Sequence, residues 1–308
     1  MTIQQHVPHR KRFLLLHNPV AGVRRRTLAR RVAVELERRG AEIVMLRFWG
    51  VTSTAPGAIA RDVQLDGFDA VVAAGGDGTV RALATALGEH TSIPIGIIAT
   101  GTGNVLANEI AMPKKPSEIA EVLMTGPVVN VAGALANKDP FFLMTGAGFD
   151  GEIVAGLDLG LKRRVGKLAY AIPILKALGK RPKPFSVMVD GAALEASWLV
   201  IANGRNYAGT YVIAPEAQLS ETGFHALLFT ARTRRGRLLE LLSVAAGLHM
   251  RLPSVKVMRC HHLVVAASGI AVQADGDPIS ESPLTVTSAG PRLRLITPPA
   301  FAKAPAVA

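Results

Sequence analysis

The feature that most constrains the fold is a strand, a glycine-rich turn and a helix start, which follow one another twice in the first third of the chain. Val71–Ala74 has the pattern of a short buried strand and runs into Gly75-Gly76-Asp77-Gly78-Thr79, after which helical periodicity begins. Ile95–Ala99 runs in the same way into Thr100-Gly101-Thr102-Gly103-Asn104. Strands that alternate with helices form parallel sheets covered on both faces. Residues 1–127 are therefore predicted to form an α/β domain with a parallel sheet.

Both turns are suited to hold phosphate groups. Glycine lets the backbone approach a ligand closely, and a helix N-terminus offers unpaired N–H groups and the positive end of the helix dipole. Turns after neighbouring parallel strands share the carboxyl edge of one sheet, where open α/β folds bind ligands. Asp77 would repel a bare phosphate. Its presence in such a turn therefore implies a bound cation, a hydroxyl group that donates a hydrogen bond to it, or a proton that it accepts. The alternative is that Asp77 or Thr79 only caps the helix.

After residue 127 the pattern changes to short strands separated by turn signals such as Asp190-Gly191 and Asp275-Gly276. This texture predicts an antiparallel β domain over 128–290 with two helical inserts. One insert, Leu161–Leu178, has an apolar stripe with basic residues around it, and we expect a kink at Pro173. The insert either packs on the sheet or faces lipid.

The charge restricts the partners. The chain has 308 residues, a net charge of +12 and a pI near 10.3, which favours nucleic acid, anionic lipid or phosphorylated substrates. Aromatic residues make up only 5% and are not interleaved with the basic ones, which argues against nucleic acid. A single cysteine and the lack of any apolar run of about 18 residues predict a cytoplasmic protein, with peripheral contact at the inner face of the membrane left open.

Other nucleotide and hydrolase motifs do not account for these turns. The sequence has neither the P-loop pattern G-x-x-x-x-G-K-[ST] nor the protein-kinase motifs, and it lacks G-x-S-x-G. Gly146–Gly151 matches G-x-G-x-x-G, but it lies beyond the α/β region and lacks a following strand that ends in an acidic residue about 20 residues on. We therefore do not interpret this segment as a dinucleotide-binding motif.

Taken in chain order, the motifs resemble the diacylglycerol kinase catalytic-domain family, which includes bacterial lipid kinases and the sphingosine and ceramide kinases. The resemblance implies an N-terminal nucleotide domain similar to phosphofructokinase and NAD kinase, to which strands return at about 291–308, and a C-terminal β-sandwich that carries much of the lipid site. The motifs that carry it are Asn18-Pro19 to Gly22, Gly75 to Thr79, Thr100 to Asn104, Gly146 to Asp150, Ala214-Pro215-Glu216-Ala217 and Asp275-Gly276.

The resemblance also implies the roles of individual residues. Asp77 would organise Mg²⁺ and the phosphates, and Asp275 would be the general base that removes the proton from a lipid hydroxyl. The implied ATP site consists of Asn18, Ser53 or Thr54, Gly75, Gly76, Asp77, Gly78, Thr79, Gly101, Thr102, Gly103 and Asn104.

Two positions depart from the family pattern. Many bacterial members have Asp-Asp-Gly where this chain has Glu221-Thr222-Gly223, which puts a structural Mg²⁺ site in doubt. The third residue of the family's Asp-Gly-Glu is Asp277 here, one methylene shorter.

The expected function is that of an ATP- and Mg²⁺-dependent kinase of a diacylglycerol-like or sphingoid lipid, in lipid metabolism at an anionic membrane surface. One alternative is a kinase of a soluble substrate, of the NAD kinase or phosphofructokinase type, which needs a polar pocket in the second domain. The other is a nucleotide-binding regulator with little turnover. Which lipid is used and whether the chain forms a homodimer stay open.

Overall fold

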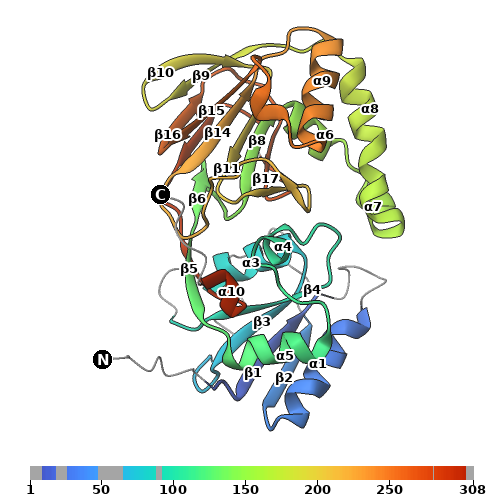
Figure 1. The fold of residues 1–308 in the computed structure, drawn as a ribbon, viewed down its shortest axis with the longest axis vertical. Coiled ribbons are helices and arrows are strands. Elements are labelled where there is room, and N and C mark those ends of the chain that lie inside the picture. Colours follow the sequence, from blue (N-terminus) through green and yellow to red (C-terminus); the bar gives the residue numbers. More distant parts are fainter. Residues whose placement is uncertain (1–8, 19–25, 48–64, 88–91, 280, 303–308) are drawn as a thin grey trace. The chain divides into compact units, whose positions relative to one another are not determined.

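The chain forms two compact units, and each is described by itself. The computed structural model describes residues 9–18, 26–47, 65–87, 92–279 and 281–302 (Figure 1). The first unit consists of 1–131 with 292–308, and the second of 132–291. Within the described residues, no helix is both long enough and apolar enough to cross a bilayer.

The first unit is built on a six-stranded sheet in the order β2-β1-β3-β4-β20-β5. The pairs β1–β2, β1–β3, β3–β4 and β4–β20 are parallel. This confirms the predicted α/β fold with a parallel sheet. The strands are β1 (Arg12–His17), β2 (Glu42–Arg47), β3 (Ala70–Gly75), β4 (Ile95–Ala99), β5 (Val128–Ala132) and β20 (Arg292–Ile296).

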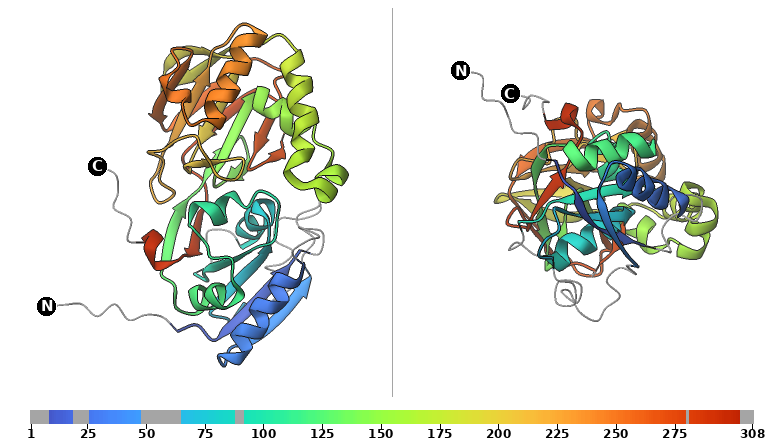
Figure 2. Two further views of the ribbon diagram at one scale, coloured as in Figure 1. Left: turned by 45° about the vertical axis from the view of Figure 1, so that its right-hand side comes forward. Right: turned by 90° about the horizontal axis from the view of Figure 1, so that it is seen from below.

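Helices cover this sheet because their apolar residues recur at helical spacing. In α1, Ala29, Val32 and Leu36 are buried and lie on one face. Right-handed crossovers place α1 and α3 on opposite faces, since β2 and β4 lie on opposite sides of the β1–β3 pair. Figure 2 shows α1 beside α5, against which it packs. The helices are α1 (Arg26–Arg38), α3 (Asp77–Leu87), α4 (Val105–Glu109), α5 (Pro116–Thr125) and α10 (Pro299–Ala302).

The boundary between the units differs from the predicted one by a few residues. The sequence placed it at residue 127, because Val128–Val131 has the short-strand texture of the second part. In the structure β5 is the edge strand of the first sheet, next to β20, and the first unit extends to residue 131.

The second unit contains two six-stranded sheets with antiparallel pairing, in the orders β10-β9-β16-β19-β6-β7 and β15-β14-β11-β8-β17-β18. A separate two-stranded ribbon pairs β12 (Asn206–Tyr207) with β13 (Tyr211–Val212). The strands of the first sheet are β6 (Ala134–Ala136), β7 (Asp139–Phe141), β9 (Phe185–Val189), β10 (Ala192–Ala196), β16 (His262–Val265) and β19 (Leu284–Thr287). Those of the second are β8 (Met144–Gly148), β11 (Trp198–Ala202), β14 (Phe224–Phe229), β15 (Val255–Cys260), β17 (Val272–Ala274) and β18 (Asp277–Pro278).

Side-chain alternation shows where each sheet is covered. In β14, Phe224 and Leu228 belong to the core shared by both sheets, whereas Leu227 and Phe229 belong to a second core under the helices. Both faces of this sheet are therefore buried. In β9 only alternate residues are buried, and Met188 on the other face is 40% exposed. This arrangement is the predicted β-sandwich with helical inserts.

The segment predicted as one kinked helix, Leu161–Leu178, consists of three shorter elements in the structure. Gly166, with a φ of 66°, ends α7 and starts a 3₁₀ segment, after which α8 begins at Ala171. Pro173 lies in the first turn of α8, where its missing N–H removes no helical bond, so the predicted kink at Pro173 is wrong. The helices are α6 (Phe149–Ala155), α7 (Leu159–Val165), η2 (Gly166–Tyr170), α8 (Ala171–Gly179), α9 (Arg234–Ala245) and η3 (His249–Arg251).

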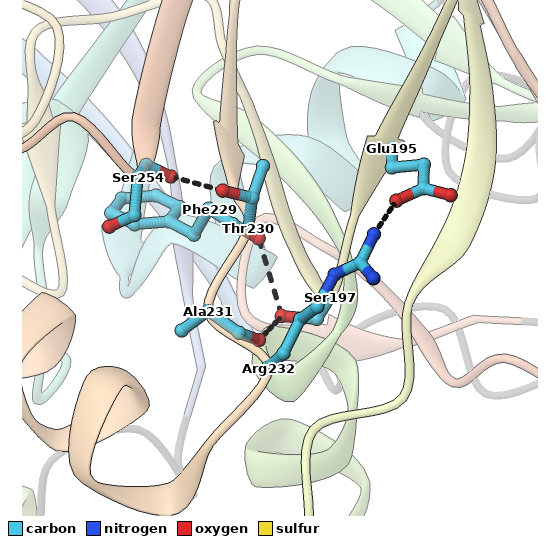
Figure 3. A network of polar contacts seen from close by, with 7 residues as sticks. All are labelled: Glu195, Ser197, Phe229, Thr230, Ala231, Arg232 and Ser254. Carbon is cyan, nitrogen blue, oxygen red and sulfur yellow. Dashed lines mark hydrogen bonds and ion pairs between the residues drawn. The ribbon is translucent and has the colours of Figure 1, made fainter.

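A polar network holds the segment between β14 and α9 against the neighbouring strands (Figure 3). The Ser197 hydroxyl donates to the carbonyl oxygens of Ala231, at 2.8 Å, and Phe229, at 3.3 Å. Thr230 Oγ1 donates to the Ser254 carbonyl at 3.0 Å, and an exposed ion pair joins Arg232 to a glutamate of β10. The start of α9 is thereby fixed to the sheet.

Candidate active site

The first group of predicted residues lies at a switch point of the parallel sheet. From β1 the chain crosses to β2 on one side, and from β3 it crosses to β4 on the other. In open α/β sheets, ligands bind beyond the carboxyl ends of strands at such a point. Asn18 follows β1 there, and the Gly75–Thr79 turn follows β3.

Hydrogen bonds join the three loops at this edge. The backbone N–H groups of Thr100 and Gly101 both donate to the carbonyl oxygen of Gly75, at 3.0 and 3.2 Å. The N–H of Asn18 donates to the Ala74 carbonyl at 3.0 Å, and its side-chain amide donates to Thr79 Oγ1 at 3.1 Å. The residues that the sequence singled out after three different strands are therefore in contact.

Gly101 is required for the contact between the loops, and Gly75 for the conformation of its own turn. A Cβ on Gly101 would lie 2.5 Å from the Gly76 Cα, a backbone atom of the other loop. A Cβ on Gly75 would lie 2.2 Å from Thr79 Oγ1. Any larger side chain at Gly101 would force the two loops apart, so this glycine sets their spacing.

Asp77 connects the two loops through its side chain. Its carboxylate oxygens accept hydrogen bonds from the backbone N–H groups of Val105 and Leu106, both at 2.9 Å. These N–H groups belong to the first turn of α4, so Asp77, the first residue of α3, caps a different helix. Asp77 therefore caps the N-terminus of α4.

The loop before α4 contains two buried polar atoms that have no partner within the described ranges. Asn104 adopts a left-handed conformation with a φ of 49°, and its side-chain amide donates to the Gly101 carbonyl at 2.8 Å. Asn104 Oδ1 and Thr100 Oγ1 are buried and have no hydrogen-bond partner among the described residues. Buried polar groups normally have a partner, so these two atoms are suited to a bound polar group.

The other predicted residues of this site are half-buried or lie outside the described part. Gly78 is in the first turn of α3, and Thr102 and Gly103 are in the loop before α4. Ser53 and Thr54 lie outside the described residues.

Asp275 lies in the second unit, in the hairpin turn between β17 and β18. Asp275 and Gly276 have φ values of 48° and 83°, as a two-residue hairpin loop of type I′ requires. The carboxylate accepts hydrogen bonds from three consecutive backbone N–H groups, those of Phe142 at 2.9 Å, Leu143 at 2.9 Å and Met144 at 3.0 Å. The side chain is therefore held in one orientation by the start of β8.

A buried side-chain network supports this turn. The Gly276 N–H donates to Gln273 Oε1 at 2.8 Å, and Gln273 Nε2 donates to Asp150 Oδ2 at 2.7 Å. The hydroxyl of Tyr207 donates to the other oxygen of Asp150. Gly146 leaves room for this carboxylate, because a Cβ there would lie 1.9 Å from Asp150 Oδ2.

Burial changes the protonation of this network. Burial raises the pKa of Asp150 above its ordinary value, and the hydrogen bonds from Tyr207 and Gln273 oppose that rise. The pKa of Tyr207 is well above its ordinary value because of burial and the adjacent carboxylate. Sequence reasoning noted the segment from Gly146 to Asp150 but gave neither Gln273 nor Tyr207 a role. The signal available in the sequence was Gly146, four positions before Asp150, because a glycine there leaves room for the Asp150 carboxylate.

The two departures from the family pattern have different surroundings. The Glu221 carboxylate forms an ion pair with Arg259 at 2.8 Å, so a structural cation there would compete with a guanidinium. Asp277 opens β18 opposite Ala274. In the part of the chain that the structure describes, no group of three His, Cys, Asp or Glu side chains is arranged to hold a metal.

Comparison with known proteins agrees with this fold and order of motifs. Residues 12–134 match the model of the diacylglycerol kinase catalytic domain, and residues 144–297 match that of the YegS C-terminal NAD kinase beta sandwich-like domain. A crystal structure of a diacylglycerol kinase from Bacillus anthracis covers 95% of this chain and 98% of its own, with a TM-score of 0.66 and 18% identity. At that identity the likeness supports the fold.

Sequence relatives extend over nearly the whole chain. A diacylglycerol kinase of Mycobacterium tuberculosis is 31% identical over 296 residues, which cover 92% of this chain and 94% of the relative. A probable lipid kinase YegS-like of Pseudomonas aeruginosa is 28% identical, with 94% of both chains covered. These relatives are named as kinases of lipids. The resemblance drawn from the motifs is thereby confirmed, and the chain belongs to the diacylglycerol kinase catalytic-domain family.

Proposed function

We propose that this protein transfers the γ-phosphate of ATP to a hydroxyl group of a diacylglycerol-like or sphingoid lipid. Membership of a kinase family implies ATP as the phosphate donor. The observation that carries the proposal is the contact between the loops after β3 and β4 at the switch point, where Gly75 and Gly101 leave room only for backbone.

The loops fit a triphosphate. The N-terminus of α3 presents the positive end of the helix dipole, which favours phosphate oxygens. The N–H groups of Thr79 and Val80 both donate to the Gly76 carbonyl, at 2.9 and 3.2 Å, which fixes the shape of the turn. Among the described residues, the buried Thr100 hydroxyl has no partner, and it can donate to a phosphate oxygen. The buried Asn104 Oδ1 also has no partner there, and as an acceptor it fits a donor such as a nucleotide hydroxyl or a water. In the proposed function Asn18 and Thr79, already bonded to each other, orient the phosphate chain.

The fit to Mg²⁺ depends on one carboxylate. Mg²⁺ is typically held by one or two carboxylates, several waters and substrate phosphates, and it would neutralise charge on the transferred group. Asp77 is the acidic residue of the loops, and each of its oxygens accepts a backbone N–H bond from α4. We therefore expect Asp77 to reach the ion through water, while it holds the loop of β4 against that of β3.

Asp275 is the proposed acceptor of the hydroxyl proton. Three backbone N–H bonds fix the direction of its carboxylate, so the proposed base is in position before the acceptor hydroxyl binds. The hairpin and the network below it have the role of positioning that carboxylate.

Transfer of label from γ-labelled ATP to a panel of acceptors tests the proposal. The panel contains a short-chain diacylglycerol, a sphingoid base and, as soluble alternatives, NAD and a sugar phosphate. We expect the wild type to label one of the lipids and neither soluble compound. Labelling of a soluble compound alone, or ATP binding without labelling of any acceptor, would overturn the proposal.

Asp77→Asn tests the site within the same assay, and Asp158→Asn is its matched control. Asp158 also accepts a helix-capping bond, from the N–H of Leu161 at 3.0 Å, but in α7 of the other unit. We expect Asp77→Asn to lower transfer roughly 100-fold and Asp158→Asn to leave it near the wild-type rate. Equal transfer by both variants would remove Asp77 from the mechanism.

A further inference from the structure

The helix α8 has apolar residues on two sides, and only one side is covered. Pro173 and Ala177 are buried, and Ile174 and Leu178 pack against the core under the helices. A helix that is apolar all round normally has partners all round. The outer side of α8 has large apolar side chains that no described residue covers.

Large side chains form a stripe on that outer side. Leu168 is 76% exposed and Leu175 is 68% exposed, with Ile172 at 51% and Val165 at 42%. These four positions are three or four residues apart, as on one side of a helix, although the 3₁₀ turn η2 interrupts the segment. We name these four side chains the outer stripe.

Exposed apolar side chains are concentrated around this stripe. In the part of the chain that is described, 16 large hydrophobic residues are exposed, and nine of them lie in the two helical segments 159–179 and 234–251. α8 and α9 are in contact and lie side by side in Figure 1. Besides the outer stripe, the nine are Leu238, Leu239, Leu242, Leu248 and Met250. Single exposed apolar residues are ordinary, whereas a concentration of them marks an interaction surface.

The charge next to the stripe has one sign. Residues 159–183 contain eight Lys and Arg and no Asp or Glu. Arg164, Lys167 and Lys176 are exposed, and none of them forms an ion pair in the described part of the chain. Large apolar side chains flanked by Lys and Arg are the pattern of helices that lie in the interface of an anionic membrane.

We propose that the outer stripe, with the exposed leucines of α9, inserts into the surface of a bilayer that contains anionic lipid. The charge decides between a membrane and a second copy of the chain, because a two-fold contact would place this positive segment against itself. The inference rests on the proposed function for its purpose, since it would bring the enzyme to the membrane that contains its substrate.

Vesicle flotation without nucleotide tests the surface independently of catalysis. The wild type is mixed with vesicles of phosphatidylcholine alone or of phosphatidylcholine with phosphatidylglycerol. We expect binding to the anionic vesicles, weakened about tenfold or more by Leu168→Gln, Ile172→Gln and Leu175→Gln together. All three side chains are more than half exposed, so the fold should be retained, which circular dichroism checks. Met188→Gln, on the exposed face of β9, is the control.

Charge reversal tests the other half of the surface. Lys167→Glu with Lys176→Glu should weaken binding to anionic vesicles about tenfold or more. Lys138→Glu with Lys256→Glu changes the net charge equally at exposed positions outside the helices and should have a much smaller effect. Equal loss from both pairs would mean adsorption through net charge and would overturn the assignment to this face.

A fluorescent label reports insertion directly. The native Cys260 is 1% exposed, and burial raises the pKa of its thiol to about 12, so it should not react with a thiol reagent. A polarity-sensitive dye on Leu168→Cys should shift to the blue on anionic vesicles, and the same dye on Met188→Cys should not. Equal shifts at both positions would overturn the proposal.

The outcomes separate this surface from the proposed function. If flotation depends on the outer stripe but no lipid is phosphorylated, the proposed membrane-binding surface is supported and the proposed kinase function is wrong. Phosphorylation of a short-chain soluble diacylglycerol by a wild type that does not float would retain the kinase and overturn the surface. If the triple Gln variant changes only the sedimentation mass, from dimer to monomer, the face is an interface between copies and the membrane proposal is wrong.

Discussion

Two hairpins of the second unit have the same Asp-Gly turn but different surroundings. Asp190-Gly191 joins β9 to β10 with φ values of 44° and 88°, and Asp275-Gly276 joins β17 to β18 with 48° and 83°. Both carboxylates accept backbone N–H groups, those of His261 and His262 for Asp190 and three from the start of β8 for Asp275. As local structures the two turns are equivalent.

The difference lies in what is beneath each turn. Asp190 is exposed, whereas Asp275 is half-buried and its turn is connected through Gln273 to the buried Asp150. A buried carboxylate is costly unless it is fully hydrogen-bonded, so the second turn carries an arrangement that local hairpin geometry does not require. This difference is consistent with the proposed role of Asp275 and with a purely structural role for Asp190.

The largest expected difference between the hairpins is in turnover. Asp275→Asn should lower the rate of phosphoryl transfer by about 10²–10⁴-fold, because an amide cannot accept the hydroxyl proton. Asparagine tolerates the positive φ, so the backbone should be kept. The measurement is kcat at saturating ATP and short-chain lipid. Asp190→Asn is the matched control and should retain near wild-type kcat, and similar losses in both variants would mean that Asp275 acts only as a turn residue.

The next effect is on stability. Gln273→Leu removes the acceptor of the Gly276 N–H and one donor to the buried Asp150, and should lower the free energy of unfolding by about 2–4 kcal/mol. Met188 occupies the equivalent position two residues before Asp190. Met188→Leu should change the free energy of unfolding by about 0.5 kcal/mol or less. Urea unfolding measures both. If Gln273→Leu lowers the free energy of unfolding no more than Met188→Leu does, the network does not support the turn.

A smaller loss is expected at the tyrosine of the same network. Tyr207→Phe removes the other donor to Asp150 and should lower the free energy of unfolding by about 1–3 kcal/mol. Tyr211 is paired with it across the two-stranded ribbon and is 47% exposed. Tyr211→Phe should therefore be close to neutral, and comparable losses in the two variants would contradict the account of the network.

The smallest effect is a change with pH. The pKa of Asp150 is raised by burial, so its protonated form stabilises the fold at low pH, and this contribution is lost as the pH rises through the raised pKa. Tyr207→Phe removes a bond that lowers this pKa. The difference in unfolding free energy between Tyr207→Phe and the wild type should thus grow as the pH rises from about 4 through the raised value. A difference that stays constant with pH would mean that Asp150 does not titrate in this range.

Local sequence signals predicted the first unit well. The turns after Val71–Ala74 and Ile95–Ala99 could be read because glycine, strand and helix signals are close together in the sequence, and parallel pairing then places the turns side by side. The capping bond from Asp77 to α4 could not be predicted, since it joins residues 28 positions apart through a loop whose path the sequence does not fix.

Long-range pairing explains what the sequence did not show in the second unit. The turn at Asp275-Gly276 was evident, but its three N–H donors come from residues more than 130 positions earlier. Tyr207 and Gln273 reach Asp150 only after the sheet and its loops have assembled. The interruption at Gly166 was missed because proline was given more weight than a glycine with a positive φ.

Calorimetric titration with ATP shows whether the loops after β3 and β4 hold the triphosphate. We expect the wild type and Asp275→Asn to bind ATP equally. Gly101→Val should bind roughly 100-fold more weakly, because its side chain would push against the Gly76 backbone. Gly179→Ala, where a Cβ meets nothing within 4 Å, should bind like the wild type. A wild type that does not bind ATP, or a Gly101→Val variant that binds it normally, would contradict the account.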